Sequence, residues 1–176
     1  MADITARADV SVGSLYHHFG GKDQLYLRLW RNYDLAHDQV SIGAVAAARH
    51  AGIADPAELL AAGARAVLEQ TWARRDLAGL FFAGDGPPGF EALKHDHRRR
   101  LSRHVDMLLQ IPHTPGNQLY ATSVLCVIGE GAREIASARS RKQARLLTDA
   151  ALGQSRRLMT GGPARPGGGD GIGTGR

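Results

Sequence analysis

The stretch DVSVGSLYHHFGGK, residues 9–22, combines a turn, a short helix and a helix stop. Ser11 suits the N-cap position, because its hydroxyl accepts a hydrogen bond from a free backbone N–H, and a helix over 12–19 is therefore expected. The pair Gly20-Gly21 ends this helix, because glycine adopts the left-handed C-cap conformation at little cost. The stretch thus predicts one short helix with a sharp boundary on each side.

The flanking residues extend this pattern to a helix-turn-helix. Residues 2–8 are a further short helix candidate, in which Ile4 and Ala8 share a face. A long amphipathic helix is predicted from about Lys22 to Gly52. Its expected apolar stripe is Leu25, Leu29, Tyr33, Ala36 and Val40. Two short helices joined by a turn and followed by a long one are typical of proteins that place the second helix in the DNA major groove.

The expected outward face of helix 12–19 is polar and small, because Leu15 and Phe19 lie four residues apart and face inward. Small residues let the backbone approach a phosphate, and hydroxyl and imidazole groups supply donors. The candidate DNA-binding residues on and before this helix are Ser11, Gly13, Ser14, Tyr16, His17 and His18.

The longer segment DITARADVSVGSLYHHFGGKDQLY, residues 3–26, resembles the DNA-binding segment of TetR-type transcriptional repressors. The matching residues are Asp3, Ile4, Ala8, Val10, Ser11, Gly13, Leu15, Tyr16, His18, Phe19, Lys22 and Leu25. The resemblance implies that Tyr16 and His17 reach phosphates and base edges and that Lys22 binds a phosphate. Asp9 stands where the family usually has glycine, and aspartate tolerates a left-handed turn better than most residues.

The first helix of the family's DNA-binding domain, which precedes ADITARA in the family, has no counterpart here. We expect either that the start at Met1 is misassigned or that the chain is shortened. The alternative function is then a helical protein-interaction module whose DNA binding is weakened or lost. An upstream coding sequence for an amphipathic helix would distinguish these cases.

The rest of the chain is predicted to be an all-α, antiparallel helical domain, and the resemblance implies that this domain serves ligand binding and dimerisation. Ala, Leu and Arg are abundant, and β-branched and aromatic residues are scarce. Helix starts are predicted at Asp55-Pro56, with Glu58 closing a capping box, and at Thr114-Pro115. The predicted helices are 56–75, 90–110, 117–137 and 140–159, with a loop over 83–90. The expected domains are 1–45 for DNA binding, 46–160 for effector binding and dimerisation, and 161–176 as a disordered tail.

Charge and cysteine content favour a cytoplasmic protein without membrane spans. The net charge is +5, which is compatible with a nucleic-acid partner. Cys126 is the single cysteine in the sequence and is expected to be a buried hydrophobe. No long uncharged apolar run occurs, so we expect no membrane partner.

The histidine-rich segment KHDHRRRLSRH, residues 94–104, is not expected to bind metal or catalyse a reaction. On a helix, His95 and His97 point about 200° apart. His97 and His104 lie about 10.5 Å apart along the axis, too far to share one ion. Its arginines are expected to form a solvated face. We therefore expect no enzyme activity, no metal and no cofactor.

Two further expectations concern ligands and partners. Trp72, Phe81, Phe82 and Phe90 are either ordinary core or the wall of a cavity for an unknown small-molecule effector. Helices 117–137 and 140–159 are either internal core or a dimer interface, and the resemblance implies that they form half of a four-helix bundle across a two-fold axis. A homodimer is also expected on physical grounds, because one recognition helix contacts too few base pairs of double-stranded DNA to select a site.

Overall fold

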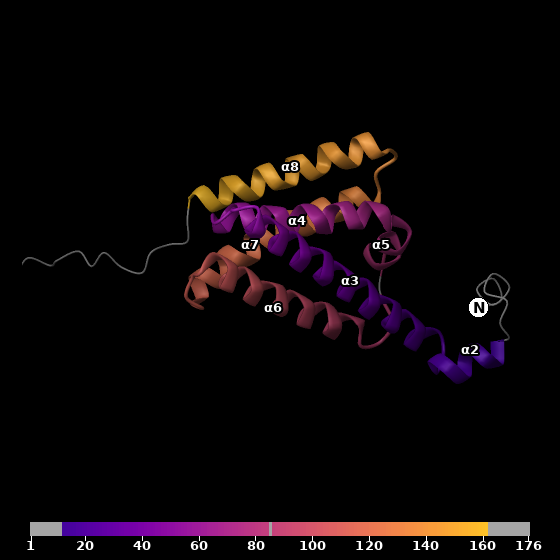
Figure 1. The fold of residues 1–176 in the computed structure, drawn as a ribbon. Coiled ribbons are helices and arrows are strands. Elements are labelled where there is room, and N and C mark those ends of the chain that lie inside the picture. The colour runs from indigo at the N-terminus through magenta and orange to yellow at the C-terminus, as the bar shows by residue number, and fades with distance from the viewer. Residues whose placement is uncertain (1–11, 85, 162–176) are drawn as a thin grey trace, which may run out of the picture.

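The computed structural model describes residues 12–84 and 86–161, and within these ranges all regular secondary structure is α-helical, with short turns and loops between the helices (Figure 1). Residues 1–11, including the candidate helix 2–8 and Ser11, lie outside the described residues, as do 162–176. The helices are α2 (Val12–Phe19), α3 (Lys22–His50), α4 (Pro56–Ala73), α5 (Arg75–Phe82), α6 (Phe90–Leu109), α7 (Pro115–Ala136) and α8 (Arg141–Thr160).

Local capping explains where the later helices begin. The Asp55 side chain accepts a hydrogen bond from the backbone N–H of Glu58 at 3.1 Å, and Pro56 follows at the first helical position, as predicted. Thr114 caps α7 in the same way. The predicted reciprocal bond of a capping box is wrong, because the Glu58 carboxylate instead accepts two hydrogen bonds from Arg156 on α8, at 2.8 and 2.9 Å.

The main core lies where α4, α7 and α8 meet, with α6 contributing from one side (Figure 1). Leu68, Val124, Ile135 and Leu152 are almost fully buried there. Burial of apolar side chains of this size stabilises the fold by about 1.5–3 kcal/mol each. The core thus fixes α7 and α8 side by side, with one face of each directed outward.

Two helix crossings depend on the absence of a side chain. A Cβ on Gly131 of α7 would lie 2.7 Å from the Cβ of Ala151 on α8. A Cβ on Gly63 of α4 would lie 2.7 Å from the Oγ of Ser41 on α3. Both distances are below those that non-bonded carbon–carbon and carbon–oxygen pairs adopt, so glycine permits a closer approach of these helices.

A second core cluster connects the first half of α3 with α5 and α6. It contains Leu27, Trp30 and Tyr33 together with Phe81 and Phe90. The predicted apolar stripe of α3 is correct at Tyr33 but displaced elsewhere, because the buried side chains include Trp30 and His37, whereas Leu25, Leu29, Ala36 and Val40 are half-buried.

The prediction that Cys126 is buried is wrong, because its side chain is exposed on α7. It lies seven residues after Leu119, which is 70% exposed, and this spacing places both on the outer face of the helix. Among the helices described, none combines the length and the apolar character that a membrane crossing requires.

Candidate nucleic-acid interface

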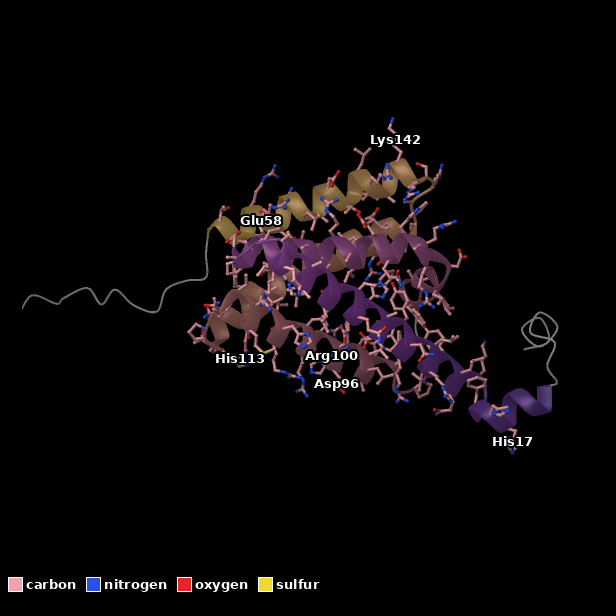
Figure 2. The ribbon with its side chains drawn as sticks, in the orientation of Figure 1. His17, Glu58, Asp96, Arg100, His113 and Lys142 are labelled. Atoms are coloured by element: carbon pink, nitrogen blue, oxygen red, sulfur yellow. The ribbon has the colours of Figure 1, made fainter. Side chains whose placement is uncertain are left out.

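The short helix α2 stands at one end of the molecule, away from the main core (Figure 1). Gly13, His17 and His18, three of the candidate DNA-binding residues, are exposed on it. Figure 2 shows His17 directed away from the helical bundle. The imidazole rings of His17 and His18 lie 5.7 Å apart, edge to face, so two donor-bearing rings share this end of the helix. Of Ser14 and Tyr16, the structure describes the helical backbone alone.

The turn after α2 depends on two glycines in the left-handed half of backbone space. The φ angle is 71° at Gly20 and 121° at Gly21, which side chains other than glycine rarely adopt. This turn places Lys22, which is exposed, at the first position of α3. The N-terminus of a helix favours anions, and the Lys22 ammonium adds a positive charge there. The arrangement can bind a phosphate beside the exposed imidazoles.

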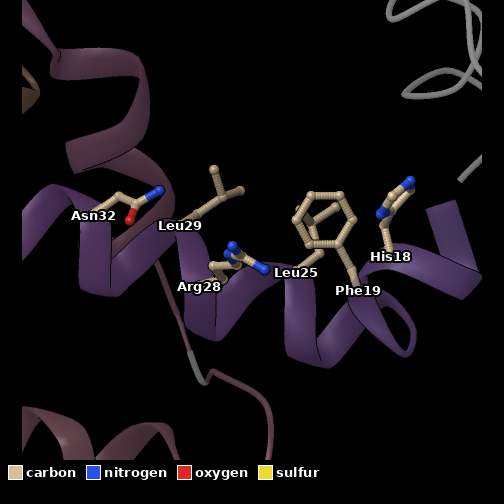
Figure 3. Close-up of a pocket in the computed structure, with 6 residues that line it drawn as sticks. All are labelled: His18, Phe19, Leu25, Arg28, Leu29 and Asn32. Carbon is tan, nitrogen blue, oxygen red and sulfur yellow. The ribbon is translucent and has the colours of Figure 1, made fainter.

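The base of α2 packs against the start of α3, and the two helices line a small cavity that is half open to solvent (Figure 3). The cavity volume is about 300 Å³. Its lining residues are His18, Phe19, Leu25, Arg28, Leu29 and Asn32. The Arg28 guanidinium lies 5.6 Å from the centre of the Phe19 ring, within the range of a cation–π contact. Phe19 therefore helps to fix the angle between α2 and α3.

The candidate ligand residues divide between the two core clusters. Phe81 and Phe90 are buried against Trp30, whose ring centre lies 5.2 and 5.1 Å from theirs. Trp72 packs against the main core and is covered by the Arg75 guanidinium at 4.5 Å. Phe82 contacts both clusters. The structure thus brings Phe81 and Phe90 together and separates them from Trp72.

An ionic cluster between α3 and α6 was not predicted from the sequence. Nη2 of Arg100 lies 2.6 Å from Asp34 and 3.2 Å from Asp38, and Nδ1 of His97 lies 2.5 Å from the other oxygen of Asp34. Figure 2 shows Arg100 on α6, the helix that lies beside α3 in this view. The predicted solvated arginine face is therefore wrong at Arg100, although Arg98, Arg99 and Arg103 are exposed. The spacing of Asp34 and Asp38 on one face of α3 was the available signal.

Burial and pairing set the ionisation of this cluster. Burial acts to raise the pKa of Asp34, but hydrogen bonds and charge from His97 and Arg100 outweigh it and lower that pKa. Burial acts to lower the pKa of Arg100, and the two carboxylates reverse this effect and raise it. Both groups are thus held in their charged forms, as an interhelical ion pair requires.

His37 lies on the same side of α3 but is held by different contacts. Its Nδ1 donates a hydrogen bond to the carbonyl of Tyr33 at 2.8 Å, and its Nε2 lies 3.2 Å from Oγ1 of Thr71. Burial lowers the pKa of His37, and the bond to Tyr33 offsets this only in part. Within the described ranges, no three histidine, cysteine or acidic side chains gather closely enough to hold a metal ion.

The features of α2, of the glycine turn and of Lys22 indicate a class of protein. A short exposed helix with donor-bearing side chains, a glycine turn and a lysine at the start of the next helix form the second half of a helix-turn-helix. Proteins of this class are DNA-binding regulators. Residues 1–29 match the sequence model of the family described as bacterial regulatory proteins, tetR family. The match supports membership of the chain in the TetR family. No curated protein sequence matches the chain.

Proposed function

We propose that the protein is a transcriptional repressor that binds a palindromic operator as a homodimer and is released by a small molecule. The observation that carries the proposal is the exposed set of His17, His18 and Lys22 around the glycine turn, within the segment that matches the family. In this arrangement Lys22 and the start of α3 hold a phosphate, while His17 probes base edges. Ser11, Gly13, Ser14 and Tyr16 complete the proposed contact surface.

The outer faces of α7 and α8 support the homodimer. The large apolar side chains of Leu119 on α7 and Leu146 on α8 are 70% and 63% exposed. Cys126 lies on the same face of α7 as Leu119 and is also exposed. A Cβ on Gly129, close to this face, would meet nothing within 4 Å, so a partner helix has room to approach. Two copies joined here form a four-helix bundle and present two recognition helices about 34 Å apart.

The effector acts through the helices that α3 contacts, which include α4, α5 and α6. The aromatic residues Trp72, Phe81, Phe82 and Phe90 belong to this region and remain the sequence-based candidates for its site. A ligand can release DNA only by binding the arrangement with low DNA affinity more tightly than the other.

A gel-shift titration over a range of salt concentrations tests the proposed interface, with DNA that adjoins the protein's own gene. Lys22→Ala should weaken binding to all sequences and lower the slope of log K against log salt by about one. Arg49→Ala removes the same charge from an exposed site in the last turn of α3, far from the glycine turn, and should leave the slope unchanged. His17→Ala should relax the sequence preference in a binding-site selection. An equal effect of Lys22→Ala and Arg49→Ala would contradict the phosphate role.

A further inference from the structure

A groove follows the C-terminal half of α6 and the loop that leads into α7. Its volume is about 490 Å³, within the range of small-molecule sites. Its lining residues are Arg100, Arg103, His104, Asp106, Met107, Gln110, Ile111 and His113. The groove is separate from the cavity under α2 and from the aromatic cluster.

The chemistry of this groove is that of a site for an apolar anion. Two arginines and two histidines line the groove with one carboxylate, Asp106. Nδ1 of His113 donates to Oδ2 of that carboxylate at 2.6 Å, whereas its Oδ1 is buried and has no hydrogen-bond partner among the described residues. Nε2 of His113 in turn lies 2.6 Å from the amide nitrogen of Gln118, which fixes the ring. Met107 is 67% exposed and supplies apolar surface next to the charges. A cationic ligand would meet two guanidinium groups here, so the charges favour an anion.

Arg100 belongs both to this groove and to the ionic cluster with α3. Both of its ion pairs with α3 are made by one terminal nitrogen, Nη2. Its Nε is buried and has no hydrogen-bond partner among the described residues. Guanidinium presents five N–H donors in a fixed fork, so Arg100 can exchange its contacts with the α3 carboxylates for contacts with another anion.

We propose that the groove binds a small carboxylate with an apolar tail, and that this ligand competes with Asp34 and Asp38 for Arg100. The carboxylate is bound by Arg100 and Arg103, and the tail lies along Met107 and Ile111. Binding therefore weakens the connection between α3 and α6. The effect on DNA binding rests on the proposed function, because α3 directly follows α2, the proposed recognition helix.

Direct binding to the whole chain without DNA tests the site. Octanoate, below its micelle-forming concentration, is titrated by calorimetry against 1-octanol and octylammonium, which carry the same tail with neutral and positive heads. Octanoate should bind and the other two should not. Arg103→Gln should weaken octanoate binding about tenfold, since it removes a charge-assisted hydrogen bond. Arg98→Gln, an exposed site on α6 outside the groove, should have no effect.

The proposed competition with α3 is tested by a variant that should strengthen octanoate binding, where Arg103→Gln weakens it. Asp38→Asn weakens the hold of α3 on Arg100 and should tighten octanoate binding about fivefold. Asp96→Asn removes the same charge from an exposed site on α6 outside the groove and is the control. The site is refuted if octanoate does not bind, if 1-octanol binds equally, or if Arg98→Gln and Arg103→Gln have equal effects. The competition is refuted if Asp38→Asn does not exceed Asp96→Asn. Because no DNA is present, these outcomes are independent of a failure of operator binding.

Discussion

The crossing of α7 and α8 at Gly131 allows a quantitative prediction about stability. A methyl group on Gly131 would lie 2.7 Å from the Cβ of Ala151, which is attached directly to the backbone of α8 and cannot rotate away. Relief therefore requires a shift of a helix that carries the main core, and overpacking of this kind costs about 1–3 kcal/mol. Alanine gains about 1 kcal/mol over glycine in helix propensity. Gly131→Ala should therefore lower the free energy of unfolding by up to about 2 kcal/mol.

Gly43→Ala is the matched control, because Gly43 lies within α3 and a Cβ there would meet nothing within 4 Å. It should raise stability by about 1 kcal/mol, so the two variants should differ by about 1–3 kcal/mol in urea unfolding. Ala151→Gly creates space for the new methyl group. In a double-mutant cycle, Ala151→Gly should therefore reduce the cost of Gly131→Ala by about 1–3 kcal/mol, the estimated cost of overpacking. The reasoning is refuted if Gly131→Ala stabilises as much as Gly43→Ala, or if the cycle shows no coupling.

Three further predictions concern pH, capping and assembly. The lowered pKa of His37 means that the unfolded chain binds a proton more readily, so stability should fall as pH decreases below about 6.5, and His37→Gln should flatten this dependence in denaturation series at several pH values. Asp55→Ala should cost about 1 kcal/mol through loss of its N-cap bond, seen as a lower urea midpoint with an unchanged slope. Leu119→Glu and Leu146→Glu should shift a dimer to monomer in sedimentation, whereas Leu35→Glu, at a similarly exposed site on α3, should not.

Local signals in the sequence were sufficient to predict most of the helices. Asp55-Pro56 and Thr114-Pro115 each combine a capping side chain with a residue whose φ angle suits the first turn, and both helices start there. The break between α4 and α5 was not predictable in this way. It occurs at Arg74, with φ −115° and ψ 31°, and neither glycine nor proline marks it. The chain bends there because α5 packs Ala78 and Phe81 into the second core cluster.

Features that depend on distant partners could not be derived from periodicity. The Asp34–Arg100 pair joins residues separated by 66 positions, and the Glu58–Arg156 pair joins residues separated by 98. An apolar run such as SVLCVIG does not show which side of its helix is covered, and Cys126 is exposed because the core lies against Val124 and Ile128 instead. The DNA-binding candidates were accessible to sequence reasoning because their signal is contained within one short segment.

The long helix α3 is the element through which the proposed ligand site and the proposed DNA surface are connected. It begins at Lys22 and carries Asp34 and Asp38 on the side that faces Arg100. The axial distance from Lys22 to Asp34 is about 18 Å at the rise of an α-helix. Because the helix is continuous and its first half packs through Trp30 and Tyr33 against α5 and α6, loss of the Arg100 contact favours a tilt of the whole segment over local unwinding. A tilt of about 5° over that length displaces Lys22 by about 1.5 Å, and in a dimer each copy would contribute such a displacement. A shift of this size is sufficient to weaken phosphate contacts that require hydrogen-bond distances.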